Sequence, residues 1–293
     1  MTLDYEPYHP QKDTLEIIGL VKKFAGEEAP VTVRQCFYYL VTLGVLKNTE
    51  EEYGRLDRFL VRARKAGFIP FDWIEDRSRR SLIIPVYSSV QEYIEEIVEG
   101  YWKDTWKNQP YLIVIVSEKE ALTSIIWSVA SYFNVPVFPT KGYVSWSILY
   151  DDFRKLVNRK YADKTLVVLM LGDYDPSGED IQEDFLKKCE FLSCSPDIVE
   201  KVALTKEQVE KFKLPPQPAK KKDPRYEKFS KEYGEYAVEL DALKPSLLRE
   251  IVRDAILKYL DVDAFLKDQE TEKKEKEKLR KIAEDIKDIG VDG

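Results

Sequence analysis

Three acidic residues follow two apolar runs in a pattern typical of a divalent-metal site. Glu118 comes soon after the run Tyr111–Val116, and Asp173 and Asp175 follow the run Thr165–Leu171. If the runs are neighbouring parallel strands, their carboxyl ends meet at one edge of the sheet, where functional residues gather. Clustered carboxylates repel one another, and Mg²⁺, or Mn²⁺ in its place, relieves that repulsion. This chemistry suits phosphoryl transfer, in which the ion stabilises transition-state charge.

Composition narrows the alternatives for this site. The chain has one histidine and three cysteines, and no Cys-x-x-Cys pair. These counts argue against zinc sites, a disulfide framework and histidine-dependent nucleophilic catalysis, so a metal is expected to have oxygen ligands. Asp-x-Asp before Pro-Ser-Gly is also ordinary turn or helix-cap chemistry, but the upstream Glu-Lys favours the metal site. Glu239 and Asp241 alternate in the same way and could supply metal ligands, but a strand-end salt bridge is the favoured interpretation for them.

The first part of the chain is predicted to be helical. Helices are expected over 13–24, 32–44 and 49–65, followed by extended segments at 68–74 and 82–86. That order of elements predicts a winged-helix arrangement. In related folds the third helix enters the major groove of DNA. The stretch 53–80 is locally basic although the net charge of the chain is −7, and its candidate DNA contacts are Arg55, Arg58, Arg62, Arg64 and Arg77. A solvated helix face is the alternative interpretation.

After a connecting helix over 90–106, strands alternate with helices. Strands are expected at 111–116, 135–138, 165–171 and 198–204, with helices at 120–133, 145–161 and 177–190. This alternation predicts an α/β fold with a mostly parallel sheet. The Glu/Lys-rich stretch 267–287 is expected to be a solvated helix. The predicted domains are residues 1–88 and 89–262, followed by a charged helical tail over 263–293.

We expect a soluble, cytoplasmic protein without a membrane segment. The apolar runs are much shorter than the roughly 20 residues that a membrane span requires. Asp4 and Glu6 stand where a secretory leader would have basic residues. With 44% hydrophobic and 34% charged residues, the composition excludes a wholly disordered chain.

The acidic motifs resemble the Toprim domain, in the variant of the topoisomerase VI A subunit and its meiotic double-strand-break relatives. The resemblance rests on Glu118-Lys119, on Thr140-Lys141-Gly142-Tyr143 and on Asp173-Tyr174-Asp175-Pro176-Ser177-Gly178. Over about residues 30–260, the layout of the chain also resembles short stand-alone Toprim proteins of phages and mobile elements. It implies that Glu118, Asp173 and Asp175 bind magnesium. Lys119 is a candidate catalytic contact to the phosphate, with an ion pair to Glu120 as the alternative, and Lys141 is a candidate DNA contact.

A second motif, Arg34-Gln35-Cys36-Phe37-Tyr38, resembles the nucleophile motif of topoisomerase VI A subunits. In that family a winged-helix domain carries the nucleophilic tyrosine four residues after an arginine, which implies Tyr38 here. The phenol would attack a DNA phosphate and form a phosphotyrosyl bond. Arg34, one helical turn back, would steady the phosphate or lower the phenol pKa. Gln35 departs from the family, which has aspartate there, and core packing is the alternative role for Tyr38.

Three functions remain open at this point. The first is a topoisomerase-like transesterase, and the second is a hydrolytic Toprim nuclease similar to the cleaving subunit of the Wadjet plasmid-restriction complex. The third is a DNA-binding module without catalysis. The first two share a metal and a substrate, so we expect a magnesium-dependent enzyme that cleaves the DNA backbone. The resemblance also implies a homodimer, and without a GxxxxGK[ST] motif strand passage would need a separate ATPase subunit.

Overall fold

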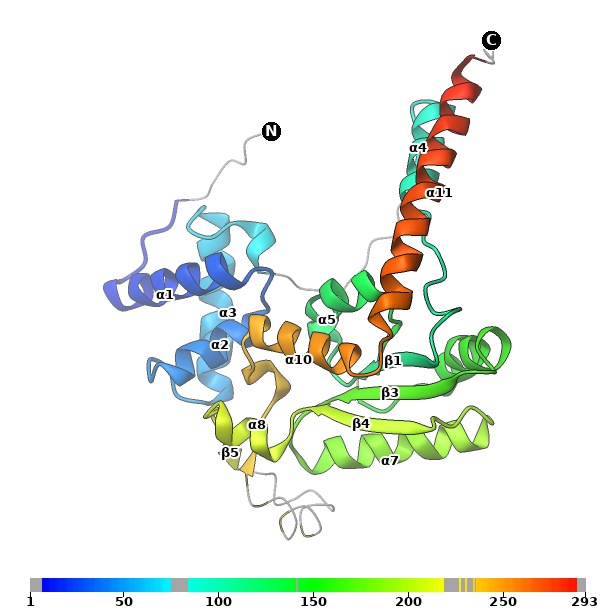
Figure 1. Ribbon diagram of the computed structural model, residues 1–293. Helices are drawn as coiled ribbons and strands as arrows, with labels where there is room; N and C mark the ends of the chain where they lie inside the picture. The colour runs from blue at the N-terminus through cyan, green and yellow to red at the C-terminus, as the bar shows by residue number, and fades with distance from the viewer. Residues whose placement is uncertain are drawn as a thin grey trace.

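The computed structural model describes residues 7–74, 84–140, 142–218 and 236–288, together with residues 227, 230 and 234. Its centre is a four-stranded parallel sheet in the order β2-β1-β3-β4 (Figure 1). The strands are β1 (Tyr111–Ser117), β2 (Val137–Pro139), β3 (Thr165–Leu171) and β4 (Ile198–Ala203). The predicted α/β class with a parallel sheet is therefore confirmed.

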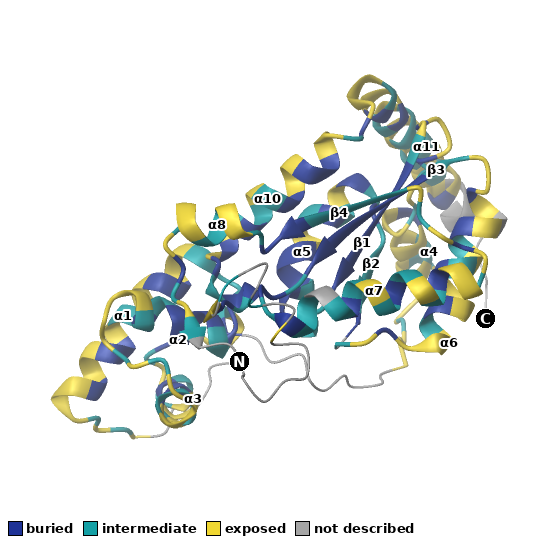
Figure 2. Ribbon diagram, turned by 90° about the horizontal axis from the view of Figure 1, so that it is seen from below, coloured by how far each residue is buried: buried dark blue, intermediate teal, exposed yellow. Residues whose placement is uncertain are grey.

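The two central strands are continuous apolar runs because helices cover both of their faces. Every residue of β1 and β3 after the first is buried, as the dark strands of Figure 2 show. The two strands pair in parallel from Tyr111 opposite Thr165 to Ser117 opposite Leu171. They end at the same level, so the residues that follow them leave the sheet side by side.

Helices pack on both faces of the sheet (Figure 1). On one face lie α7 (Pro176–Phe191) and a helical segment over 146–160, joined by the buried rings of Phe153 and Phe185, whose centroids are 5.5 Å apart. The segment begins as α6 (Trp146–Ile148) and continues largely in π-helical turns, so the helix predicted over 145–161 is present with irregular hydrogen bonding. On the other face lie α5 (Thr123–Ala130) and α10 (Pro245–Leu257), which contact each other.

Three N-terminal helices form a second hydrophobic core. They are α1 (Lys12–Glu28), α2 (Val33–Thr42) and α3 (Glu50–Lys65), close to the predicted ranges. A capping box begins α2, in which Thr32 and Gln35 each accept the other's backbone N–H.

The prediction of an extended segment over 68–74 is wrong. A 3₁₀ turn occupies Phe71–Trp73, and Ile74 makes a single parallel bridge to Val31. Pro70 immediately precedes the turn, and proline, which lacks an N–H, favours turns over sheet pairing. Residues 84–86 form no strand, and the remainder of the second predicted segment lies outside the described residues.

Two helices far apart in the sequence form an arm that projects from the sheet domain (Figure 1). They are α4 (Val90–Glu99) and α11 (Val262–Asp288), which pack side by side. The helix predicted over 90–106 ends early, where Gly100 follows α4. The prediction of a helix over 267–287 is confirmed, but the prediction that it is solvated is wrong in part. Helix α4 covers one side of α11 and leaves Ala283 3% exposed.

The remaining elements connect the two cores. After β4, α8 (Lys206–Lys211) leads to a small antiparallel pair of β5 (Gln217–Pro218) and β6 (Tyr236–Ala237). Ala242, which follows β6, packs against both hydrophobic cores. None of the described helices combines the length and the apolar character that a membrane crossing requires.

Candidate active site

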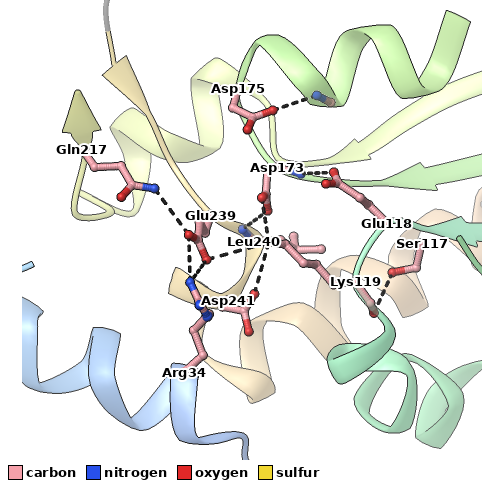
Figure 3. Close-up of polar contacts among 11 residues, drawn as sticks. Arg34, Ser117, Glu118, Lys119, Asp173, Asp175, Gln217, Glu239, Leu240 and Asp241 are labelled. Atoms are coloured by element: carbon pink, nitrogen blue, oxygen red, sulfur yellow. Dashed lines mark hydrogen bonds and ion pairs between the residues drawn. The ribbon is translucent and has the colours of Figure 1, made fainter. Parts of the chain in front are cut away.

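The ends of β1 and β3 bring Glu118 and Asp173 together (Figure 3). The backbone N–H of Glu118 donates to the Leu171 carbonyl at 2.9 Å, and the backbone N–H of Asp173 donates to Glu118 Oε2 at 3.2 Å. A Cβ on the intervening Gly172 would lie 3.0 Å from that same carboxylate oxygen. Glycine at this position therefore permits the close approach of the two strand ends.

Asp175 serves as the N-cap of α7. Its Oδ1 accepts the backbone N–H of Gly178 at 2.7 Å, and Pro176 occupies the first helical position, where its missing N–H costs nothing. A Cβ on Gly178 would lie 2.5 Å from the Asp173 carbonyl, so the turn is tightly packed. The helix-cap role is thus realised, and Figure 3 shows the Asp175 carboxylate turned toward the helix rather than toward Lys119.

A segment from much later in the chain completes the site. Tyr174 and Val238 exchange two backbone hydrogen bonds of 2.9 Å, which dock the segment after β6 against the end of β3. The backbone N–H of Leu240 then donates to Asp173 Oδ1 at 2.8 Å. Glu239 and Asp241 consequently lie beside Asp173 (Figure 3). Their alternation was the one sequence signal for this placement, and the predicted salt bridge at this position is confirmed.

Lys119 is the cation at the centre of these acids. Its Nζ lies 2.7 Å from Asp173 Oδ2, 3.7 Å from Glu239 Oε2 and 3.8 Å from Asp241 Oδ2. Burial alone would lower the pKa of Lys119, but the facing carboxylates outweigh burial and raise that pKa. The ammonium therefore stays charged in the free protein.

Burial also sets the charge of the acids. It raises the pKa of Asp173 to about 7 and that of Asp241 to about 6, against the opposing effect of Lys119. It raises the pKa of Glu118 as well, although the Asp173 N–H favours the ionised form. Burial would do the same to Glu239, but Lys119 and Arg34 lower its pKa below the usual value. The strand-end acids are thus incompletely neutralised, which is the condition a further cation relieves.

Helix α2 presents Arg34 and Tyr38 to this cluster. Arg34 donates to both carboxylate oxygens of Glu239 at 2.8 and 2.9 Å, and its guanidinium lies over the Tyr53 ring. Tyr38 is 3% exposed and its ring packs edge-on against Phe37. Burial raises the pKa of the Tyr38 phenol, Glu239 raises it further, and Arg34 only partly opposes them. Arg34 lowers this pKa as predicted, but the net shift is upward because desolvation dominates.

The candidate DNA contacts on α3 divide into two kinds. Three are exposed, namely Arg55, Arg58 and Arg62. Arg64 is half-buried, donates to the Ile74 carbonyl at 3.2 Å and lies over the Phe71 ring, so it holds the turn that follows the helix. Arg77 and Lys141 lie outside the described residues.

The donor chemistry of the strand-end acids fits a hard divalent cation. Within the described part of the chain, no three His, Cys, Asp or Glu side chains are already arranged as a metal-binding group. Glu118 and Asp173 are nevertheless adjacent oxygen donors, and the ammonium of Lys119 already lies against Asp173 Oδ2. Oxygen ligands of this kind are those that Mg²⁺ prefers.

No protein-family model matches this chain, and no curated protein matches its sequence.

Proposed function

We propose that this protein is a magnesium-dependent enzyme that cleaves the DNA backbone, with a Toprim-like site and a winged-helix-like domain that presents the DNA. One observation carries the proposal. The helix that bears Arg34 and Tyr38 is joined by the Arg34–Glu239 pair to the segment after β6, which itself lies beside Lys119 and Asp173 at the ends of two parallel strands. That arrangement combines a candidate nucleophile, phosphate-binding cations and oxygen ligands for a metal.

The roles of the residues follow from their environments. Glu118, Asp173 and Asp175 would hold Mg²⁺, which supplies charge stabilisation at the phosphate when it is bound. Lys119, kept charged by its neighbours, would donate charge-assisted hydrogen bonds to a phosphate oxygen. Arg34 fixes α2 against the site through two hydrogen bonds to Glu239. The exposed arginines of α3 would contact DNA phosphates farther along the duplex.

Tyr38 is the proposed nucleophile of a covalent reaction. Its phenol oxygen would form a bond to phosphorus while the bond from phosphorus to the leaving sugar oxygen breaks. The phenol is protonated in the free protein because its pKa is raised, so a base must take the proton. Glu239 is the carboxylate with the largest effect on that pKa, but its own pKa is lowered and both of its oxygens accept from Arg34, so it is a weak base for this phenol and the proton must leave to solvent.

Hydrolysis by water is the second candidate, and the burial of Tyr38 favours it. A phenol that is 3% exposed must become more accessible before it can attack a phosphate. Gln35, at the position where the resembling family has aspartate, is engaged in capping its own helix. In a hydrolytic enzyme Tyr38 would be a packing residue only.

Plasmid cleavage tests the proposal and separates these candidates. Wild type, Tyr38→Phe and Asp173→Asn are assayed with Mg²⁺ or Mn²⁺, with and without protease, beside the controls Tyr132→Phe and Asp151→Asn, which change exposed residues. Asp173→Asn should reduce cleavage by about 100-fold or more, and both controls should cut like wild type. Loss of cleavage in Tyr38→Phe with protein-linked ends supports the covalent reaction, whereas retained cleavage with protein-free ends supports hydrolysis. No cleavage by wild type contradicts the enzyme and favours a DNA-binding module.

The homodimer, and a separate ATPase subunit for strand passage, belong to the same proposal. The Arg34–Glu239 pair joins α2 to acids of its own chain, whereas the resemblance implies a tyrosine from one protomer and a metal from the other. Mixing the Tyr38→Phe and Asp173→Asn proteins distinguishes a site formed within one chain from a site shared between protomers. If the sites form between protomers, about half of the dimers in an equal, exchanging mixture are mixed and each holds one intact site of two, so the mixture should recover about a quarter of wild-type cleavage. A mixture as inactive as its components contradicts shared sites.

A further inference from the structure

A cavity of about 230 Å³ lies between the N-terminal helices and the segments that follow β4. Its wall is mainly apolar and includes Phe24, Tyr39, Phe212, Leu214, Leu243 and Leu247. The rings of Phe24 and Tyr39 are stacked, with centroids 4.4 Å apart and planes inclined by 11°. The cavity therefore has room for a ring-sized ligand and an aromatic wall to receive it.

Two buried polar residues of the cavity wall have unused hydrogen-bonding capacity. Gln35 and Asp241 are each 2% exposed, and Gln35 Nε2 and Asp241 Oδ1 have no hydrogen-bond partner among the described residues. The amide of Gln35 is oriented by Thr32, whose N–H donates to Oε1 at 2.9 Å, so the unused atom is a donor. Asp241 faces Lys119 with its other oxygen. Buried polar atoms normally have partners, and these two atoms are fully buried, so a ligand reaches this one donor and one acceptor only when the surrounding cavity wall moves.

Two exposed lysines, Lys213 and Lys244, also line the cavity. Within the described part of the chain, neither has a carboxylate at ion-pair distance. The cavity thus combines an aromatic interior, one donor, one acceptor and a positively charged rim. A ligand that matches all four has a flat ring with adjacent polar atoms and carries an anionic group.

We propose that this cavity binds a nucleotide. The base would lie against Tyr39, with its polar edge accepting from Gln35 Nε2 and donating to Asp241 Oδ1, and its phosphate would lie at the two lysines. Nucleobases are read in this way, by hydrogen bonds to the Watson–Crick edge together with aromatic packing. The nucleotide is either a free mononucleotide or one unit of a DNA strand turned out of its stack. This binding site does not depend on the proposed cleavage.

Titration of the full chain in EDTA with dTMP, dCMP, dAMP and dGMP tests the site, with deoxyribose 5-phosphate as the probe without a base. Thr42→Trp places a large ring at the cavity wall from an exposed position. Lys213→Gln with Lys244→Gln removes the charged rim, and Lys206→Gln with Lys211→Gln on α8 is the matched control. At least one nucleotide should bind saturably to wild type. Thr42→Trp and the rim variant should each lower the affinity for that nucleotide about tenfold or more, and the control should bind it like wild type.

Three results would overturn the proposal. They are the absence of saturable binding at millimolar concentrations, equal binding of deoxyribose 5-phosphate, and unchanged binding in a Thr42→Trp protein that melts like wild type. Single-stranded DNA distinguishes the two sources. If the ligand is a strand unit, an oligonucleotide should displace the mononucleotide, and an oligonucleotide of abasic sites should not. A protein that binds nucleotides in EDTA but never cleaves DNA would support this site and contradict only the proposed function.

Discussion

Two ion-pair networks join distant parts of this chain, and they differ in their contact with water. In the candidate active site, Lys119 contacts Asp173, whose side chain is 8% exposed, and Asp241, whose side chain is 2% exposed. In the arm, Arg280 of α11 pairs with Glu99 of α4 at 2.6 Å, and these side chains are 50% and 66% exposed. Both networks pair a basic with an acidic side chain, at shortest distances of 2.7 Å and 2.6 Å, and they differ in burial and in the number of acids around the cation.

That difference decides what each network does. Burial raises the pKa values of Asp173 and Asp241, whereas Arg280 lowers the pKa of the exposed Glu99, as in an ordinary surface pair. A buried, partly neutralised cluster with perturbed pKa values is typical of functional sites, because it gains most when a cation or substrate arrives. The arm pair is screened by water and salt and serves mainly to align the two helices.

The largest expected effect comes from removing the Lys119 ammonium, which faces two buried acids. Lys119→Met leaves Asp173 and Asp241 without their nearest cation and should reduce the free energy of unfolding by about 3–5 kcal/mol. Urea unfolding at neutral pH in EDTA measures this loss. Lys103→Met, which removes a lysine paired with Glu275 at the arm, is the matched control and should stay near wild type. Equal losses in the two variants would contradict the difference between the networks.

The next effect depends on pH and concerns Asp241. Its folded pKa of about 6 lies above the ordinary 3.8, so between these values the native state holds a proton that the unfolded chain has lost. Wild type should therefore lose stability as pH rises from about 4 to about 6, and Asp241→Asn should lack that loss. The stability of the variant relative to wild type should rise by up to about 3 kcal/mol over this range. Unfolding curves at successive pH values measure it, and a constant difference would show that burial does not perturb this group.

The smallest effect is expected in the arm. Arg280→Gln and Glu99→Gln each remove a pair that is largely exposed and screened by salt. Their melting temperatures should lie within experimental error of wild type at physiological ionic strength, with a small loss visible only at low salt. Thermal unfolding at two salt concentrations checks this. A clear loss that persists at high salt would show that the arm depends on this pair for its packing.

Local signals predicted the regular elements well. The apolar runs of β1 and β3, the Thr32 cap of α2 and the Asp175-Pro176 start of α7 are each encoded within a few residues. The errors lie where a neighbour from elsewhere in the chain decides. The stretch 267–287 is polar enough to be solvated, yet α4 covers one side of it. Residues 68–74 are apolar enough for a strand, but they meet one bridging residue, Val31, rather than a sheet.

By itself, the sequence determined that Glu118 and Asp173 each follow the end of a strand, because alternation and strand length are local properties. That these two strands are neighbours was decided by the tertiary structure. Only the tertiary structure decided which cation serves these acids and how far water reaches them. The Tyr174–Val238 pairing brings in Glu239 and Asp241, and Lys119 turns toward this cluster. The physical reason is that pKa values and ion pairs depend on desolvation and on distances between segments more than 50 residues apart, for which the sequence holds no local signal.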